Sequence, residues 1–228
     1  MILIFNTIIN SKARDNFTHV IAPLITFGRK YQVITLDDEL PELSQFTRLL
    51  ITGSELSASQ GSEWDEIIIS IIKYFVKSEK PILGICHGHQ MIARAIAGNS
   101  VCRRADIPEF GWKKIQIEDN FLFKGISNPV FLESHYDEVC NLPEEFNIIA
   151  ANSDCAVQAF QYRNLPIWGI QFHPEMQFDN GFKMVQNHLA ENLQDNKFYK
   201  DELKNKTQID QNFKIFNNFI NSKFQESL

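Results

Sequence analysis

The chain has 228 residues, of which 44% are hydrophobic and 22% are charged, which is typical of a globular protein. Its net charge of -6 at pH 7 gives no general attraction to nucleic acid or to anionic membranes, so we expect neither as a partner. The apolar N-terminal run, residues 1–5, is far too short to cross a membrane and lacks the basic start of a secretion signal. No two of the 4 cysteines have Cys-x-x-Cys spacing. We therefore expect a cytoplasmic protein with reduced thiols and neither a metal ion nor an organic cofactor.

The first part of the chain alternates short apolar runs with longer stretches of helical periodicity. Residues 13–28 and 62–77 are predicted helices, because their apolar side chains recur every three or four positions. The runs predicted as buried parallel strands are residues 1–5, 31–36, 47–52 and 81–85. Repeated strand-helix-strand order predicts a doubly wound sheet.

The second part of the chain has closely spaced strand-like runs, which predict an antiparallel or mixed extension of the same sheet. These runs are residues 112–117, 130–134, 147–151, 157–162 and 167–172. A helix is predicted over residues 181–193, then a polar insert at about 194–211 and a C-terminal helix at about 212–224 with an apolar stripe. We therefore expect an α/β protein in which residues 1–228 form one domain. Its core would be an open mixed, largely parallel and flavodoxin-like sheet flanked by helices.

The most informative segment is residues 81–90, where an apolar strand runs into Cys86 and a helix-forming stretch follows at once. Gly84 and Gly88 flank the cysteine at two positions on either side, as a side chain exposed on a sharp strand-to-helix turn requires. The helix start would favour the thiolate, and the N–H of His87 could stabilise an oxyanion. The alternative is a small buried apolar residue, which is what a lone cysteine usually is. Packing alone does not require the Gly-x-Cys-x-Gly-x-Gln pattern, so we favour a nucleophile.

A second motif ends a later strand, where residues 167–175 read Ile-Trp-Gly-Ile-Gln-Phe-His-Pro-Glu. Active groups of open parallel sheets gather at the carboxyl ends of strands, and Cys86 and His173 both occupy such ends. Pro174 restricts His173 to an extended backbone, and Glu175 could accept the second imidazole N–H. A nucleophile, a base and an orienting carboxylate are then all present. The alternative is a His-Pro turn beside a solvated glutamate.

Other segments at predicted strand ends could complete such a site. A buried strand ends at Gly53 and Ser54, whose N–H groups could form the other half of an oxyanion hole, unless the segment is a plain turn. Ser134 and His135 also follow a strand and either line the pocket or simply end that strand. Residues 109–112 are interpreted as a turn before a strand.

These motifs resemble those of the class I, or triad-type, glutamine amidotransferases. The match runs in order over residues 45–220 and is strongest at residues 84–90 and 171–175. Residues 134–139 are similar to the family's Ser-His-x-Asp-x-Val segment, and residues 109–112 to its Glu-x-Gly-Trp segment. The long polar segment before the last helix resembles the stand-alone, GMP-synthase-like branch, which includes γ-glutamyl peptide hydrolases. The resemblance implies an α/β fold with a mixed central sheet.

The resemblance also implies a mechanism, in which Cys86 attacks the side-chain amide of glutamine and His173 delivers a proton to the departing ammonia. A glutamyl thioester on Cys86 would then be hydrolysed by water. The other matching positions are Glu175 in the triad, Gly53, Ser54 and His87 in the oxyanion hole, and Gln90, Ser134 and His135 in the glutamine pocket. The implied partners are a glutamine or γ-glutamyl substrate and a synthetase subunit that uses the ammonia.

Two features depart from the family pattern. The family's oxyanion strand often ends Gly-Gly-Pro or Gly-Pro-Gly, whereas residues 52–55 read Thr-Gly-Ser-Glu, which leaves open which N–H donates. The sequence also has no Ser-Gly-Gly-x-Asp-Ser loop and no Gly-x-x-x-x-Gly-Lys loop, so the ATP-dependent step would belong to a separate synthetase.

Three other functions stay open from the sequence. The chain could be a free-standing γ-glutamyl peptide hydrolase, a non-catalytic amidotransferase-like binding module, or a cysteine peptidase of a related nucleophile-elbow fold. The intact Cys86, His173 and Glu175 argue against the binding module. The His-Pro-Glu motif at the end of a late strand favours the amidotransferase over the peptidase.

Overall fold

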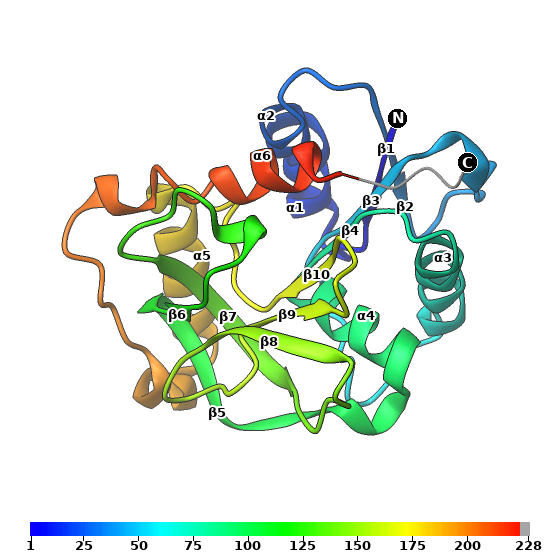
Figure 1. The fold of residues 1–228 in the computed structure, drawn as a ribbon. Coiled ribbons are helices and arrows are strands. Elements are labelled where there is room, and N and C mark those ends of the chain that lie inside the picture. Colours follow the sequence, from blue (N-terminus) through cyan, green and yellow to red (C-terminus); the bar gives the residue numbers. More distant parts are fainter. Residues whose placement is uncertain (224–228) are drawn as a thin grey trace.

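The computed structural model describes residues 1–223, which build a central 8-stranded sheet with helices packed against both faces (Figure 1). The strand order is β2-β1-β3-β4-β10-β9-β8-β6. Neighbours are parallel from β2 to β10 and antiparallel from β10 to β6. The strands are β1 Ile2–Asn6, β2 Tyr31–Thr35, β3 Arg48–Ile51, β4 Ile82–Ile85, β6 Gln116–Ile117, β8 Phe146–Ala151, β9 Ala159–Tyr162 and β10 Ile167–Ile170. The predicted open, mixed and largely parallel sheet is confirmed.

The side chains of β1 alternate between two hydrophobic cores, as successive residues of a strand must. Leu3 and Phe5 pack with residues of α3 and α4, whereas Ile2 and Ile4 pack with residues of α2 and α6 on the opposite face. The helices are α1 Ser11–Asn16, α2 Ala22–Ile25, α3 Asp65–Lys77, α4 His87–Ala97, α5 Phe178–Glu191 and α6 Lys214–Asn221. Burial on both faces explains why the parallel strands are continuous apolar runs rather than alternating ones.

The helix predicted over residues 13–28 is not one regular helix. It consists of α1, a π-helical turn over Phe17–Ile21 and the short α2. Pro23 lies in the first turn of α2, where it has no N–H to donate and its ring crowds the preceding turn. The widened π-helical turn just before this proline is one way in which a helix accommodates that interruption.

A second sheet corrects the prediction that every later strand extends the first one. Strands β5 (Cys102–Lys114) and β7 (Val130–Val139) pair antiparallel with each other and form a separate 2-stranded sheet. Their side chains Trp112 and Leu132 pack with α5 in a third hydrophobic cluster. The strand predicted over residues 112–117 is therefore divided, because β5 belongs to this small sheet and β6 belongs to the large one.

The C-terminal part wraps back over the molecule (orange to red in Figure 1). The polar segment contains short 3-10 helices at Leu193–Phe198 and Lys206–Ile209, and Ile209 is buried in the third cluster. Helix α6 then buries Ile215, Phe216, Phe219 and Ile220, which is the apolar stripe seen in the sequence. The last predicted residue of this helix, 224, lies outside the described residues.

None of the helices within residues 1–223 combines the length and the apolar character needed to cross a membrane.

Candidate active site

Cys86 occupies a strained turn between β4 and α4. Its backbone has φ 50° and ψ -105°, a left-handed conformation that non-glycine residues rarely adopt. A Cβ atom on Gly84 would lie 2.4 Å from the carbonyl oxygen of Gly88, and one on Gly88 would lie 2.7 Å from that of Ile51. Both glycines are therefore needed for the close approach of backbone segments around the turn.

The surroundings of the Cys86 sulfur are polar although the residue is buried. Helix α4 begins at the next residue, so its N-terminus places partial positive charge beside the sulfur. The side-chain amide of Gln171 donates toward Sγ at 3.5 Å, and Sγ lies 3.9 Å from the backbone oxygen of Ser134. These groups hold the sulfur in place at the edge where β4 and β10 end.

His173 and Glu175 lie just beyond the end of β10, next to Cys86. The Nδ1 atom of His173 lies 2.7 Å from Oε1 of Glu175, which leaves Nε2 for the cysteine. Burial alone would lower the pKa of His173, but the charge of Glu175 and the hydrogen bond to Cys86 raise the pKa well above its usual value. The two side chains thus lie together, as a base and its orienter require.

A strand-to-strand contact fixes the position of His173. The N–H of His173 donates to the backbone oxygen of Leu132 in β7 at 2.9 Å. The small sheet therefore docks on the large one at this residue. Ser134, two residues further along β7, reaches the site in this way.

The loop after β3 brings Gly53 and Ser54 against the same pocket. A Cβ atom on Gly53 would lie 3.0 Å from Cε1 of His173 and 3.5 Å from Cβ of Cys86. Within residues 1–223, the N–H groups of Gly53, Ser54 and His87 donate to no protein acceptor. They are free to bind an oxyanion.

The unusual Glu55 of this loop has a local structural role. Its carboxylate accepts hydrogen bonds from the N–H groups of Ile9 at 2.7 Å and Asn10 at 3.2 Å. Ser54 Oγ donates to the backbone oxygen of Thr7 at 2.6 Å. The Thr-Gly-Ser-Glu sequence therefore ties the loop to the chain that follows β1.

Gln90 lies behind the cysteine rather than beside it. Its side-chain amide donates to the backbone oxygen of Asp137 at 2.9 Å and to Oε1 of Gln171 at 3.1 Å. Because Gln171 in turn donates toward Cys86, Gln90 orients the side chain that contacts the sulfur. Gln171 opens the motif that contains His173 and Glu175, but from the sequence we assigned it no role in the site.

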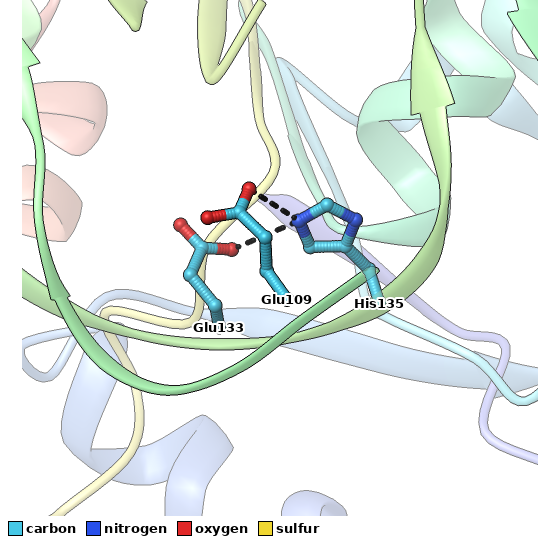
Figure 2. Close-up of side chains that lie close together, drawn as sticks. All are labelled: Glu109, Glu133 and His135. Atoms are coloured by element: carbon cyan, nitrogen blue, oxygen red, sulfur yellow. Dashed lines mark hydrogen bonds and ion pairs between the residues drawn. The ribbon is translucent and has the colours of Figure 1, made fainter. Parts of the chain in front are cut away.

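His135 makes contacts different from those expected of a pocket residue. Its Nδ1 lies 3.0 Å from the backbone oxygen of Asp137, and its Nε2 lies 3.1 Å from Glu109 and 3.4 Å from Glu133 (Figure 2). The backbone oxygen of Asp137 accepts from Nδ1 and the Glu109 carboxylate accepts from Nε2, so both nitrogens donate and the ring is an imidazolium. Burial alone would lower the pKa of His135, but the two carboxylates outweigh it and raise the pKa to about 10.

Glu109 is the centre of this buried network. It also accepts from Lys113 at 2.8 Å, Asn152 at 2.7 Å and Gln158 at 2.7 Å. Residues 109–112 were interpreted as a turn, but they belong to β5, which is why the carboxylate points inward. Side-chain atoms of Glu109, Glu133 and His135 lie within 4.8 Å of one another, as in a metal site. His135 and Lys113 already supply positive charge there, so we interpret the cluster as an internal ion network.

His188 is a residue at the pocket that the sequence did not identify. Its Nε2 lies 2.9 Å from Asp195 and 3.2 Å from the hydroxyl of Tyr136, which also bonds Asp195, and its ring stacks on Phe110 at 4.4 Å. A histidine within an amphipathic helix carries no positional signal in the sequence. The contact ties α5 and the polar segment after it to the rim of the site.

Two cavities meet at Cys86, with volumes of about 370 Å³ and 290 Å³. The larger contains His173 and Glu175, and the smaller contains Gln90 and His135. A third cavity of about 700 Å³ lies elsewhere, between β5 and the polar segment, and is lined by Lys113, Asp154 and Lys200. The reactive groups therefore open to two spaces of comparable size.

Comparison with known proteins identifies the family. The sequence profile described as "Glutamine amidotransferase class-I" matches residues 12–192. A protein of Saccharolobus solfataricus, named as a glutamine-hydrolyzing GMP synthase subunit, is 33% identical over 178 residues, which cover 76% of this chain and 92% of that protein.

A second relative and a solved structure agree with this match. The protein of the same name from Pyrococcus furiosus is 41% identical over 108 residues, 46% of this chain, and the chain spans only 56% of its length. The crystal structure of a glutamine amido transferase from Methylobacillus flagellatus covers 100% of this chain and 98% of its own, with a TM-score of 0.74 and 18% identity. At that identity the structure supports the fold alone. The chain belongs to the class I glutamine amidotransferase family.

Proposed function

We propose that this chain hydrolyses the side-chain amide of glutamine and supplies the ammonia to a separate synthetase subunit. The observation that carries the proposal is the position of Cys86 on a strained turn, with the paired His173 and Glu175 beside it. The names of the relatives, which are glutamine-hydrolysing subunits, support the same reaction.

In the proposed reaction the Cys86 thiolate attacks the amide carbonyl carbon, and the carbonyl oxygen becomes an oxyanion. The N–H groups of His87 and of Gly53 or Ser54 then donate to that oxygen. The C–N bond breaks as His173, held by Glu175, gives a proton to the departing nitrogen. Water, deprotonated by the same histidine, hydrolyses the thioester and releases glutamate.

The acyl part of the substrate is proposed to occupy the smaller cavity at Cys86. Arg104 lines that cavity, with its guanidinium 3.9 Å from the centre of the Tyr136 ring, and is a suitable partner for the α-carboxylate of glutamine. Ser134 contributes its backbone, whose oxygen lies near the sulfur. His135 acts behind this wall, because both of its nitrogens are already bonded.

Ammonia release from glutamine tests the proposal. Purified chain should release ammonia, and Cys86→Ala should abolish it, by at least about 1,000-fold. Cys140→Ala is the matched control, because that half-buried thiol lies outside the pocket and its loss should leave the rate unchanged. Equal rates in wild type and Cys86→Ala would refute the assignment of the nucleophile.

Addition of a synthetase subunit tests the second half of the proposal. We expect weak turnover by the chain alone and faster turnover with a GMP-synthase-type ATP pyrophosphatase subunit, in the cytoplasmic setting that both would share. A rate that stays the same across such subunits would argue for a self-sufficient hydrolase.

Thiol labelling separates catalysis from a non-catalytic binding role. Burial raises the pKa of Cys102 to about 12 and also raises the pKa of Cys155, so both should be inert. A glutamine-like electrophile should therefore label Cys86 far faster than either. Equal labelling of the three thiols would favour the binding module.

A further inference from the structure

The cavity of about 700 Å³ between β5 and the polar segment has no part in the proposed reaction, since it shares no lining residue with the two cavities at Cys86. Its volume is typical of small-molecule sites, which measure about 300–1,000 Å³. Four lysines, five side-chain amides, one serine, two carboxylates and three apolar residues line it. The lining is thus strongly polar and carries more positive than negative charge.

One wall of this cavity is held against β5 by backbone hydrogen bonds (orange in Figure 1). The N–H of Lys200 donates to the backbone oxygen of Phe110 at 3.0 Å. The N–H of Glu202 donates to the backbone oxygen of Trp112 at 2.7 Å. Gly111 permits this close approach, because a Cβ atom there would lie 2.1 Å from the backbone oxygen of Lys200. This wall is therefore part of the sheet edge rather than a separate loop.

Two side-chain amides order the loops that complete the cavity. Oε1 of Gln208 accepts hydrogen bonds from the N–H groups of Lys204 at 2.6 Å and Asn205 at 3.2 Å. In the loop after β8, Oδ1 of Asn152 accepts from the N–H groups of Asp154 at 2.9 Å and of the next residue at 2.7 Å. The cavity is therefore preformed, and a ligand would need little further ordering of the protein.

Lys113 joins this cavity to the buried network around Glu109. Its side chain is 2% exposed and donates to Glu109 at 2.8 Å and to Asp154 at 3.1 Å. Lys200 also donates to Asp154, at 2.6 Å. Burial alone would raise the pKa of Asp154, but the hydrogen bonds from the two lysines lower the pKa to about 2. Because two ammonium groups neutralise this carboxylate, it does not make the cavity negative.

Lys114 and Lys204 supply positive charge that no carboxylate of the described residues balances. Both are exposed, and within residues 1–223 neither ammonium group has a hydrogen-bond or ion-pair partner. The second carboxylate of the lining, Glu202, accepts from the backbone N–H of Lys114 at 2.9 Å instead. Two such ammonium groups on one preformed cavity are suited to a phosphate group, which lysine binds as a point charge.

The uncharged lining residues indicate what the phosphate would be attached to. Side-chain amides both donate and accept hydrogen bonds, as the hydroxyl groups of a sugar require. The side chains of Gln116 and Asn128 make no hydrogen bond within residues 1–223, so they are available to a ligand. The described part of the lining contains no aromatic side chain, so a nucleobase would find no ring on which to stack. The lining therefore favours a sugar over a nucleoside.

We propose that this cavity is a binding site for a sugar phosphate. Lys114 and Lys204 bind the phosphate group, and the amides of Gln116 and Asn128 bind the sugar hydroxyls. The binding involves no covalent step and uses no residue of the Cys86 site. It is therefore independent of the proposed glutamine hydrolysis, and either proposal can fail without the other.

Calorimetric titration of the full chain with four probes tests the ligand class. The probes are ribose 5-phosphate, ribose, inorganic phosphate and AMP. Ribose 5-phosphate should bind with a Kd of about 1 mM or lower. Ribose and inorganic phosphate should each bind at least about 10-fold more weakly, because each lacks one half of the contacts. AMP should bind no more tightly than ribose 5-phosphate, because its base gains no stacking partner.

Substitutions at exposed positions locate the binding. Lys114→Gln and Lys204→Gln should each weaken the binding of ribose 5-phosphate about 10-fold, because each removes a charge-assisted hydrogen bond. Gln116→Ala should weaken it about 3-fold and leave the binding of inorganic phosphate unchanged. Lys183→Gln is the matched control, since Lys183 is exposed on α5 and does not line the cavity, and it should change the Kd by less than about 2-fold. The midpoint of urea unfolding checks that each variant is folded.

Four results would overturn the proposal. The first is no binding of ribose 5-phosphate at several millimolar. The second is equal affinity for ribose 5-phosphate and inorganic phosphate, which would leave the amides without a role. The third is tighter binding of AMP, which would indicate a nucleotide site. The fourth is an equal loss of affinity in Lys183→Gln and Lys204→Gln, which would mean that the anion binds to the protein surface in general.

Discussion

Two buried histidines of this chain each face a carboxylate, yet their rings are held in opposite ways. His173 bonds Glu175 through Nδ1 and turns its other nitrogen toward Cys86. His135 donates from Nε2 to Glu109 (Figure 2) and from Nδ1 to a backbone oxygen, so no nitrogen is left for a substrate. A histidine–carboxylate pair can therefore act on a proton only where the second nitrogen faces a reactive atom. With both nitrogens bonded inside the protein, the same pair is a fixed positive charge.

Substitution of each histidine by asparagine should show the difference between the two residues most clearly. His173→Asn should fold normally and lose at least about 1,000-fold in kcat, because the thiolate loses its proton partner. His135→Asn should fold poorly, because Glu109 loses its imidazolium. Ammonia release and urea unfolding of both variants measure the two effects. Full stability of His135→Asn would contradict the structural role of that residue.

Glu109 should matter for stability more than for chemistry. Glu109→Gln breaks a buried network of charges, which typically lowers the free energy of unfolding by about 3–5 kcal/mol. Glu118→Gln, the same change at an exposed position, should alter it by no more than about 0.5 kcal/mol. Urea denaturation of both variants gives the difference. Equal stabilities would mean that the network contributes nothing.

The pH dependence of stability should reveal the stabilising charge of the His135 imidazolium. The pKa of His135 is about 10 in the folded chain and about 6.5 in an unfolded one. A group whose pKa is higher in the folded chain than in the unfolded chain stabilises the fold fully at pH values below its unfolded pKa. This stabilisation is lost as the pH rises toward its folded pKa. The free energy of unfolding should thus fall between pH 7 and 10. The fall should be shallower in Glu109→Gln, where His135 keeps fewer carboxylate partners, and an identical slope would contradict this cause.

Gly53→Ala should have the smallest effect of the series. The added Cβ would lie 3.0 Å from the His173 ring, so the ring must move by a few tenths of an ångström. Such a displacement should lower kcat about 10-fold with little change in stability. Gly28→Ala has no atom within 4 Å to meet and serves as a control for glycine replacement, although its φ of 74° adds some backbone strain. A kcat unchanged in Gly53→Ala would place the loop further from the reaction than the geometry indicates.

The sequence predicted the large sheet and the proximity of Cys86 to His173 for one physical reason. Both residues end apolar runs that form parallel strands, and β4 and β10 prove to be direct neighbours in the sheet. Parallel neighbours bring their carboxyl ends to one edge. Two motifs far apart in the chain could therefore be placed together without any knowledge of the connections between them.

The parts that the sequence did not predict depend on long-range packing. Whether β5 and β7 join the large sheet or form their own depends on α5, which covers them with apolar residues. The inward turn of Glu109 follows from that strand pairing, and so does the bonding of both His135 nitrogens. His188 reaches the site only because the segment after α5 folds back, and no local pattern marks it.

The most direct measurement is to find the acyl intermediate. The chain is mixed with glutamine, quenched in acid within the first turnover, and digested for mass spectrometry under conditions that preserve thioesters. We predict a glutamyl adduct on the peptide that contains Cys86, present in wild type and in Cys140→Ala and missing in Cys86→Ala. Glutamine hydrolysis with an adduct on a different cysteine, or hydrolysis that persists in Cys86→Ala, would contradict the assignment of Cys86 as the nucleophile.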